Sequence, residues 1–501
     1  MNGKCSFFIT VSLLLIFFSF FFSCKQSKEQ LPELRIKEGK AIIEGKFNKV
    51  FPKVSSLTLR YRNPITAEEI SVEKKVEPDG SFNFEIPVEC SVVFGKLYIL
   101  DQNPFLIELF ADEVTFLVFN QDPENHSLVL KSDKKNLLTE QDKVSLQSVS
   151  DKFFEYLNNF APRCDLTPKD FSDYEMKMMK KRIDYAMKGV KLSYAGRNFA
   201  LNEFKLLHLS LILLNYKELV EMLHRNRYNV GSFIAQEPDL SYYKFLKNFN
   251  LNNQQYLYNT HYSVVLQQLL SLKILNIPPI SEMSVTEWIN YVKDVLKDLI
   301  GFDSGMFYDI LAANSFAMQY NYEVIPLSEK QIKNIKEYFG DGEITKILLK
   351  KNDEIVELAK RKSDVVINKT PDVPKDQLMD SIISNYKNKV VFVDFWATWC
   401  APCLEAIKKT AIIKDKMKDK NVVFIYITDE SSPIELWNKT IKSIPGEHFY
   451  IKREESIFLM KSFGFQVIPS YLLFDKKGEL CEKLLGYPGS DAIQETIEKL
   501  L

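Results

Sequence analysis

Two cysteines near the C-terminal end of the chain are separated by two residues, in the segment Trp399-Cys400-Ala401-Pro402-Cys403. The apolar run Val390 to Phe395 that precedes them is typical of a buried strand, and a helical pattern follows them. This order of strand, aromatic turn, Cys-x-x-Cys and helix places both thiols at the N-terminus of a helix. Unpaired backbone N–H groups and the helix dipole favour the thiolate there. The segment therefore indicates α/β structure and a cysteine pair suited to thiol–disulfide chemistry.

The spacing of the two thiols gives them different predicted roles. Cys400 stands where the helix begins, so we predict that it is the nucleophile. Cys403 follows about one helical turn later, so its sulfur can reach Cys400 and close a redox-active disulfide. Pro402 lies in the first turn, where its missing N–H removes no helical hydrogen bond.

A metal site is the competing interpretation of such a pair. Structural zinc needs four ligands, usually two Cys-x-x-Cys pairs, and this sequence has one. His448 is isolated in the sequence, and we expect it to be a surface or hydrogen-bonded loop residue. The sequence therefore favours redox chemistry, with no metal and no cofactor.

The net charge of the chain argues against a nucleic-acid partner. The 501 residues carry a formal net charge of -1, whereas nucleic-acid binding needs a basic face, so we expect no nucleic-acid partner. The Lys-rich stretch Lys408 to Lys420 also contains Asp415 and Asp419, and we interpret it as a solvated helix face.

An apolar run at the N-terminus, Phe7 to Phe22, ends at Ser23-Cys24. The run is marginal for a membrane span and typical of a cleaved export signal. Its end resembles a bacterial lipobox, although Phe21 stands where Leu is usual. We therefore predict a signal peptide of the lipoprotein type at residues 1–23 and lipidation of Cys24.

The polar residues that follow are predicted to be a tether, at 24–33. An uncleaved N-terminal membrane anchor is the alternative to a lipoprotein. Both interpretations place the rest of the chain outside the cytoplasm, in the cell envelope and facing the periplasm.

The patterning of the remaining chain predicts a multidomain protein. Short alternating runs predict an all-β, sandwich-like domain at 34–135, and helical spacing predicts an all-α middle region at 136–364. Within the latter, Phe204 to Leu223 is apolar on most sides, which predicts one central helix. A linker is expected at 365–374, followed by alternating strands and helices at 375–501.

Three further cysteines, Cys90, Cys164 and Cys481, are scattered along the chain. We expect each of them to be a small buried apolar residue. A bridge between Cys90 and Cys164 is left open.

The segment Asp394 to Cys403, Asp-Phe-Trp-Ala-Thr-Trp-Cys-Ala-Pro-Cys, resembles the active-site segment of the thioredoxin superfamily. More narrowly, it resembles TlpA-like and ResA-like envelope thiol–disulfide oxidoreductases. A second motif, Phe463 to Gly478, is similar to the cis-proline strand and hairpin of this family. The resemblance implies an α/β thioredoxin-like fold at 375–501 and a cis bond at Ile468–Pro469 beside the cysteines.

The resemblance also implies roles for individual residues. Asp394 matches the buried acid of the family, which exchanges a proton with the second cysteine. We expect Trp399, Pro402, Ile468 and Pro469 to bind the substrate, with the backbone of Ile468 pairing with a substrate strand.

One acidic residue departs from the family pattern. Many TlpA-like proteins carry a Glu three residues after the second cysteine, where this chain has Ala406. Its acid is Glu405, one position earlier, and a rotation of about 100° on the helix turns that side chain away. We therefore expect Glu405 to be a surface residue.

Together these features predict a membrane-anchored, extracytoplasmic thiol–disulfide oxidoreductase that reduces protein disulfides. The reducing direction is implied by the resemblance alone, and a membrane electron-donor thiol protein would be needed as a partner. One alternative is a disulfide oxidase or isomerase. Another is a binding lipoprotein in which the thioredoxin-like domain serves as a scaffold.

Overall fold

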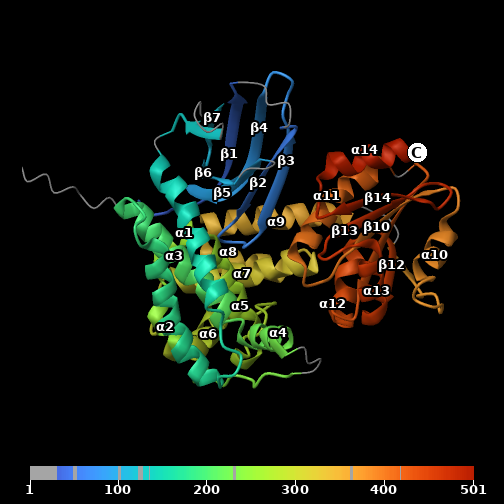
Figure 1. Ribbon diagram of the computed structural model, residues 1–501. Coiled ribbons are helices and arrows are strands. Elements are labelled where there is room, and N and C mark those ends of the chain that lie inside the picture. The colour runs from blue at the N-terminus through green and yellow to red at the C-terminus, as the bar shows by residue number, and fades with distance from the viewer. Residues whose placement is uncertain are drawn as a thin grey trace, which may run out of the picture.

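The computed structural model of the protein describes residues 31–48, 54–99, 103–121, 128–134, 136–228, 233–360, 365–417 and 419–501. They form a β-rich N-terminal region, a helical middle and a C-terminal α/β region, packed side by side (Figure 1). The predicted signal peptide, Cys24 and most of the tether lie outside the described residues. Within the described part of the chain, no helix has the length and apolar character needed to cross a membrane.

The N-terminal region contains two four-stranded sheets, with strand orders β4-β1-β7-β8 and β3-β2-β5-β6. The alternation of apolar and polar residues along the strands explains how these sheets form. In β2, for example, Leu57, Leu59 and Tyr61 are buried, while Arg60 between them is exposed. Both sheets contribute side chains to one core. The strands are β1 (Ile36–Phe47), β2 (Ser56–Arg62), β3 (Glu69–Lys75), β4 (Ser81–Cys90), β5 (Val92–Ile99), β6 (Phe105–Phe110), β7 (Glu113–Gln121) and β8 (Leu128–Ser132).

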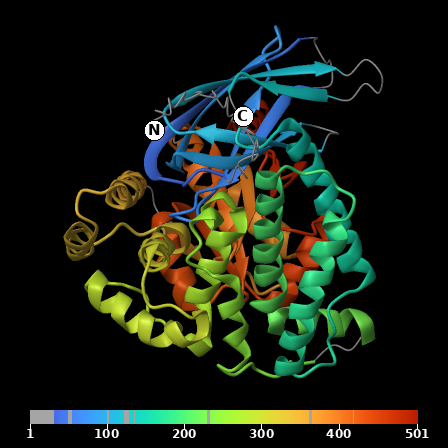
Figure 2. The ribbon, with the colours of Figure 1, turned by 90° about the vertical axis from the view of Figure 1, so that its left-hand side faces the viewer.

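The helical middle lies beneath the N-terminal strands (Figure 2). Its helices begin at polar caps: Thr139 and Ser328 each form a capping box, and the Ser284 side chain accepts a hydrogen bond from the N–H of Glu287. The α-helices are α1 (Glu140–Asn159), α2 (Pro168–Met187), α3 (Tyr194–His208), α4 (Tyr216–Tyr228), α5 (Thr260–Ser271), α6 (Val285–Ile300), α7 (Met306–Met318), α8 (Glu329–Phe339) and α9 (Glu343–Lys360).

The single helix predicted from Phe204 to Leu223 is wrong. Helix α3 ends at His208, a π-helical turn spans Leu209–Leu213, and α4 starts at Tyr216. A π turn inserts an extra residue into the helical ladder. A segment that is apolar on most sides gives no sign of such a shift, because either register buries apolar side chains.

The C-terminal region is built on a six-stranded sheet of order β14-β13-β10-β11-β12-β9. Strand β9 lies inside the segment 365–374 that was predicted to be a linker, and it pairs in parallel with β12 at the sheet edge. The elements are β9 (Val365–Asn368), α10 (Leu378–Ile383), β10 (Val390–Phe395), α11 (Ala401–Lys416), β11 (Val422–Asp429), α12 (Ile434–Thr440), β12 (Gly446–Ile451), α13 (Arg453–Phe463), β13 (Ser470–Phe474), β14 (Leu480–Leu485) and α14 (Ser490–Leu500).

Strand β10 is buried on both faces, which explains its continuous apolar sequence. Val391, Val393 and Phe395 share a core with α10 and α13. The alternate residues Val390 and Phe392 belong to the core that includes α11 and α14. Because side chains alternate along a strand, Asp394 faces the same side as Phe392, towards α11.

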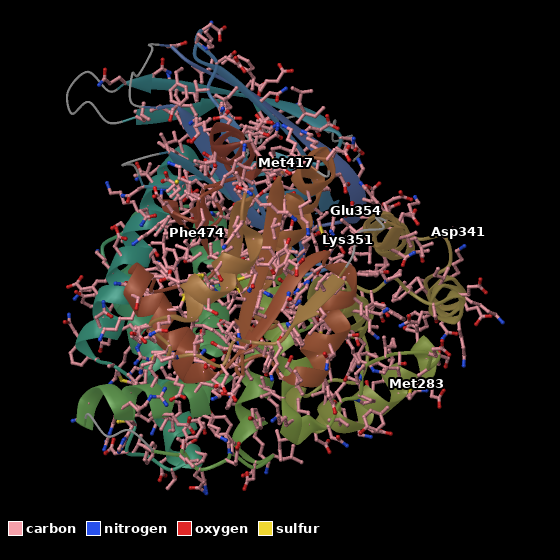
Figure 3. All side chains as sticks on the ribbon, turned by 90° about the vertical axis from the view of Figure 1, so that its right-hand side faces the viewer. Met283, Asp341, Lys351, Glu354, Met417 and Phe474 are labelled. Carbon is pink, nitrogen blue, oxygen red and sulfur yellow. A yellow bond between two sulfur atoms is a disulfide. The ribbon has the colours of Figure 1, made fainter. Side chains whose placement is uncertain are left out.

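Helices α11 and α12 contact the two upstream regions. The Lys409 ammonium donates a hydrogen bond to the Ser71 carbonyl oxygen of β3, and the Thr440 hydroxyl of α12 donates to the Tyr322 carbonyl oxygen over 3.2 Å. Lys351 and Glu354 of α9 lie close together near this junction (Figure 3). The helix that carries the cysteine pair is therefore enclosed between the sheet and the upstream regions.

Candidate functional site

The two cysteines form a disulfide at the start of α11, with an S–S distance of 2.02 Å. Cys400 is the N-cap residue of the helix, and the Cys403 backbone N–H donates a hydrogen bond to Cys400 Sγ over 3.2 Å. Cys400 is 4% exposed and Cys403 is fully buried. The strand–turn–helix order therefore produces the expected geometry, in which the helix N-terminus is directed at the first sulfur.

The turn before β13 lies beside this disulfide. The Ile468–Pro469 peptide bond is cis, as the resemblance implied, and the Ile468 carbonyl oxygen is 3.9 Å from Cys400 Sγ. Pro469 is buried and Ile468 is half-buried, whereas Val467 is exposed. The turn at Ile468–Pro469 thus places backbone groups next to the Cys400 sulfur and is exposed at Val467.

Trp399 projects from the turn that precedes the helix. Its side chain is 55% exposed, and its indole N–H donates a hydrogen bond to the Ser431 hydroxyl over 3.1 Å. Trp396, by contrast, is buried. Trp399, Val467 and the exposed Pro402 therefore present apolar surface around a nearly buried sulfur.

Asp394 is the buried acid of the site, and it is 1% exposed on β10. In the sheet register it lies between two aromatic neighbours, Tyr426 on β11 and Tyr471 on β13. Its Oδ1 is buried and accepts no hydrogen bond from the residues that the structure describes. Burial raises the pKa of Asp394 well above its usual value, while the charge of Lys414 acts in the opposite direction.

Lys414 was not singled out by the sequence. It follows Cys403 by eleven residues, which is about three helical turns, so both side chains lie on the sheet-facing side of α11. Burial lowers the pKa of Lys414 to about 7, and the charges of Asp415 and Asp394 oppose that shift. The interpretation of Lys408 to Lys420 as a solvated face is therefore wrong at this position, although the spacing from Cys403 was a usable signal.

The prediction that Glu405 is a surface residue is also wrong. Its side chain is 17% exposed and lies 3.5 Å from Lys409 Nζ and 4.0 Å from Lys408 Nζ. Burial raises the pKa of Glu405, and the nearby Glu68 carboxylate raises it further. The rotation along the helix does turn Glu405 away from the sheet, but the upstream regions cover that side of α11.

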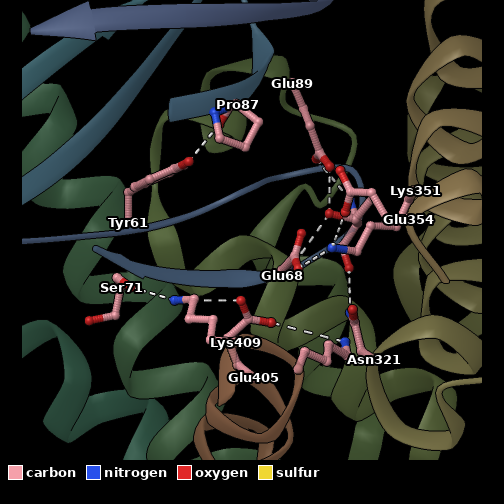
Figure 4. A network of polar contacts seen from close by, with 12 residues as sticks. Tyr61, Glu68, Ser71, Pro87, Glu89, Asn321, Lys351, Glu354, Glu405 and Lys409 are labelled. Atoms are coloured by element: carbon pink, nitrogen blue, oxygen red, sulfur yellow. Dashed lines mark hydrogen bonds and ion pairs between the residues drawn. The ribbon is translucent and has the colours of Figure 1, made fainter. Parts of the chain in front are cut away.

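Glu405 thereby joins a charged cluster made by all three regions of the protein (Figure 4). Lys351 of α9 pairs with Glu68 and with Glu354, the latter at 2.9 Å. Glu89 of β4 accepts hydrogen bonds from the N–H groups of Ile65 and Thr66. The cluster borders a cavity of about 240 Å³ between the β-rich region, α9 and α11. Lys409, which pairs with Glu405 and lies six residues after Cys403, connects the active-site helix to the β-rich region through its hydrogen bond to the Ser71 carbonyl oxygen.

Among the remaining candidates, Cys90 and Cys164 are buried as expected, whereas the expectations for His448 and Cys481 are wrong. His448 is a buried strand residue; its Nε2–H donates a hydrogen bond to the Ile444 carbonyl oxygen over 2.6 Å, and burial lowers its pKa to about 4. Cys90 and Cys164 are buried free thiols, so the bridge left open between them is not formed. Cys481 is exposed on β14, where the short edge strand leaves it uncovered. Among the described residues, no group of three or more His, Cys, Asp and Glu side chains is arranged to hold a metal ion.

Comparisons with known proteins concern the C-terminal region. Residues 388–480 match a protein-family model described as Thioredoxin-like. The thiol–disulfide oxidoreductase ResA of Bacillus thuringiensis is 25% identical over 118 residues, which cover 24% of this chain and 67% of the relative. The thiol–disulfide oxidoreductase YkuV of Bacillus subtilis is 24% identical over 119 residues, covering 23% and 78%.

A solved structure has also been matched, that of the thioredoxin domain of a thiol–disulfide oxidoreductase from Bacteroides vulgatus. It is 23% identical and covers 23% of this chain and 81% of the matched chain, with a TM-score of 0.21.

Proposed function

We propose that this protein, whose C-terminal region belongs to the thioredoxin superfamily, is a thiol–disulfide oxidoreductase that reduces disulfides of other proteins outside the cytoplasm. The observation that carries the proposal is the position of Cys400. Its sulfur receives the Cys403 N–H at a helix N-terminus and lies 3.9 Å from the Ile468 carbonyl oxygen. A thiolate is stabilised there, next to backbone groups that an extended substrate can reach.

The reaction consists of two exchange steps that start from the reduced dithiol. The Cys400 thiolate attacks one sulfur of a substrate disulfide, forms a mixed disulfide and releases the other substrate sulfur as a thiolate. The Cys403 thiolate then attacks Cys400 Sγ and displaces the second substrate sulfur. Two electrons pass to the substrate, which becomes a dithiol, and the enzyme is left with the Cys400–Cys403 disulfide.

The second step requires that buried Cys403 loses its proton. We assign the acceptor role to Asp394, which faces α11 from β10 and whose raised pKa brings its proton affinity closer to that of a thiol. Lys414, on the same helix as Cys403, carries a positive charge that partly offsets the rise in the pKa of Asp394. Both groups are shielded from solvent, so the proton affinity of the carboxyl depends on its immediate neighbours.

Substrate docking would use the exposed rim of the site. Trp399 and Pro402 offer apolar contact on one side of Cys400, and the Ile468–Pro469 turn offers backbone hydrogen-bonding groups on the other. An extended polypeptide can pair with such a turn and bring its own disulfide to the sulfur. This favours protein disulfides over small free disulfides as substrates.

We further propose that the protein is attached to a membrane and that a partner protein reduces its cysteine pair again. The lipobox-like segment ending at Cys24 supports attachment to a membrane through lipid on that residue, with the protein in the cell envelope and facing the periplasm. Because each turnover leaves a disulfide, a membrane electron-donor thiol protein must reduce the Cys400–Cys403 pair again.

A trapping experiment tests the exchange reaction. Cys403→Ser retains the nucleophile and removes the resolving thiol, so we expect mixed disulfides with envelope proteins that disappear on addition of dithiothreitol. The matched control is the Cys400→Ser/Cys403→Ser double variant, which should trap nothing. If Cys403→Ser traps no more than this control, the protein does not act by exchange, and the alternative of a binding lipoprotein with a thioredoxin-like scaffold is favoured.

The direction of electron flow is tested separately by the reduction potential of the Cys400–Cys403 pair, measured against glutathione buffers. A reductant should have a potential near that of thioredoxin, about -270 mV. A potential nearer about -120 mV, as in strong oxidants, would instead show a disulfide oxidase.

A further inference from the structure

We propose that a cleft between the N-terminal strands and the helical middle binds a small organic anion with an apolar or aromatic body. The cleft lies between one face of β2 and β5 and the helices α1, α3 and α5, and its volume is about 430 Å³. Small-molecule sites commonly measure about 300–1,000 Å³ and combine apolar walls with a few polar groups. This site is separate from the cysteine pair and does not depend on the redox chemistry.

Two cations on the sheet face of this cleft form no salt bridge with the residues described, although the charge of Lys96 acts at longer range on the Glu203 carboxylate in the wall of the cleft. Arg60 of β2 and Lys96 of β5 lie directly opposite each other in the antiparallel register, and both are exposed. Within the described part of the chain neither forms an ion pair; the Arg60 guanidinium instead lies 5.0 Å from the centroid of the Tyr98 ring. Like charges directly opposite each other destabilise a strand pair. A bound anion would remove this unfavourable contact.

The other cations that line the cleft are already neutralised. Arg62 pairs with Glu69, and Lys143 of α1 pairs with Glu108 at 3.2 Å. The positive charge available to a ligand is therefore concentrated at Arg60 and Lys96. Two adjacent cations are suited to one carboxylate, because each of its oxygens can accept a charge-assisted hydrogen bond.

The helical side of the cleft supplies apolar surface. Phe94 of β5 packs against Phe199 and Tyr258, with ring centroids 4.8 and 5.8 Å apart. Phe154 of α1 lines the same cleft and is 40% exposed. A ring or short aliphatic body placed between Phe154 and the sheet would bury this exposed aromatic surface.

A further polar group remains unsatisfied in the wall. The Glu203 Oε1 of α3 accepts hydrogen bonds from the His261 ring and from the Thr260 hydroxyl, over 2.8 and 3.0 Å. Its Oε2 is buried and has no hydrogen-bond partner among the residues described. Buried polar atoms are rarely left without a partner, so this oxygen is a place for an N–H or O–H group on a part of the ligand distant from its anionic group, which the Glu203 carboxylate repels.

Direct binding to the purified full chain tests the proposal, with 2-naphthoate as the anionic probe and 2-naphthamide as its neutral analogue. We expect 2-naphthoate to bind with a Kd of about 1 mM or tighter, and the amide to bind at least about tenfold more weakly. Calorimetric titration measures both. Failure of 2-naphthoate to bind in this range, or equal affinity for the two probes, overturns the proposal.

Charge-removing variants locate the site. Arg60→Gln and Lys96→Gln should each weaken binding of 2-naphthoate about tenfold and leave the affinity for the amide unchanged, since one hydrogen bond to a charged group is removed. The matched control is Lys74→Gln, an exposed lysine of β3 that does not line the cleft. Thermal unfolding shows whether each variant is folded. Equal loss in the control, or no loss in either cleft variant of a folded protein, contradicts the assignment.

Discussion

The Lys414 ammonium group lies 3.5 Å from the Tyr426 hydroxyl and 5.0 Å from the centroid of that ring. Tyr426 is the register neighbour of Asp394, so this contact places a cation near the buried carboxyl. Lys414 and Cys403 project from the same side of helix α11. The proposed proton acceptor Asp394, the cation of Lys414 and the thiol of Cys403 therefore share one contact between helix α11 and the sheet.

Replacement of the cation should slow the second exchange step. In Lys414→Met, Asp394 loses the charge that lowers its pKa, so less of the carboxyl is ionised at neutral pH. We expect resolution of a preformed mixed disulfide on Cys400 to be about three- to tenfold slower at pH 6.5, with its pH profile moved to higher pH. Rapid-quench measurement of substrate release gives the rate.

The matched control for this variant is Lys416→Met, an exposed lysine two residues later on α11 that loses the same charge. Its pH profile should remain that of the parent protein. A similar displacement in both variants would attribute the effect to the overall charge of the helix rather than to the position of Lys414.

The buried carboxyl should make stability depend on pH. Because burial raises the pKa of Asp394 in the folded state, the neutral form contributes stability below the unfolded pKa of about 4, and that contribution is lost as pH rises through the folded pKa. We expect Asp394→Asn, which remains neutral, to be more stable than the parent at pH 7 by about 1 kcal/mol or more.

Urea unfolding at pH 4 and pH 7 measures this difference. The two proteins should differ by only about 0.4 kcal/mol at pH 4, because the parent carboxyl is then neutral in the folded state and about half protonated in the unfolded state. A gap that is the same at both values would show that the substitution acts through packing rather than through ionisation.

The cluster on the outer side of α11 should stabilise the contact between the regions. Lys351→Met leaves the Glu68 carboxylate without its main partner in a site where Glu68 is 7% exposed. Leaving a buried charge unpaired is strongly destabilising, so we expect a loss of about 3 kcal/mol. The Glu68→Gln/Lys351→Met double variant should recover part of it, since no unpaired charge remains.

Urea unfolding again provides the measurement, with Lys297→Met as the control. Lys297 forms an exposed pair with Asp294 on α6, and such pairs contribute about 0.5 kcal/mol or less. If Lys351→Met costs no more than this control, the Lys351–Glu68 pair does not stabilise the contact between the helical middle and the β-rich region.

Several features of the site follow from local pattern. The strand β10 and the helix start at Cys400 were predictable, because a continuous apolar run and the order of strand, turn and helix are local features of the sequence. The cis bond before Pro469 came from a motif. The continuous helix from Phe204 failed because a π turn has no signature in an apolar segment.

The residues whose environment was predicted wrongly share one physical cause. Glu405, Lys414 and His448 look like solvated residues in the sequence, yet each is covered by segments remote along the chain. Ser71 and Tyr322, which contact the elements around α11, lie more than 100 residues from their partners Lys409 and Thr440. Which face of a helix is covered is a property of such contacts.

The residue pattern alone was enough to predict the chemistry proposed for this protein: two thiols at a helix start, beside a proline turn and above an acidic strand residue. Tertiary structure alone decided the environment of that chemistry. It buried the acid next to a lysine, anchored the active-site helix to a charged cluster and opposed Arg60 to Lys96 in a cleft. The reason is that thiol reactivity and helix capping are local, whereas burial, and with it the strength of every charge, is set by segments that meet only when the chain folds.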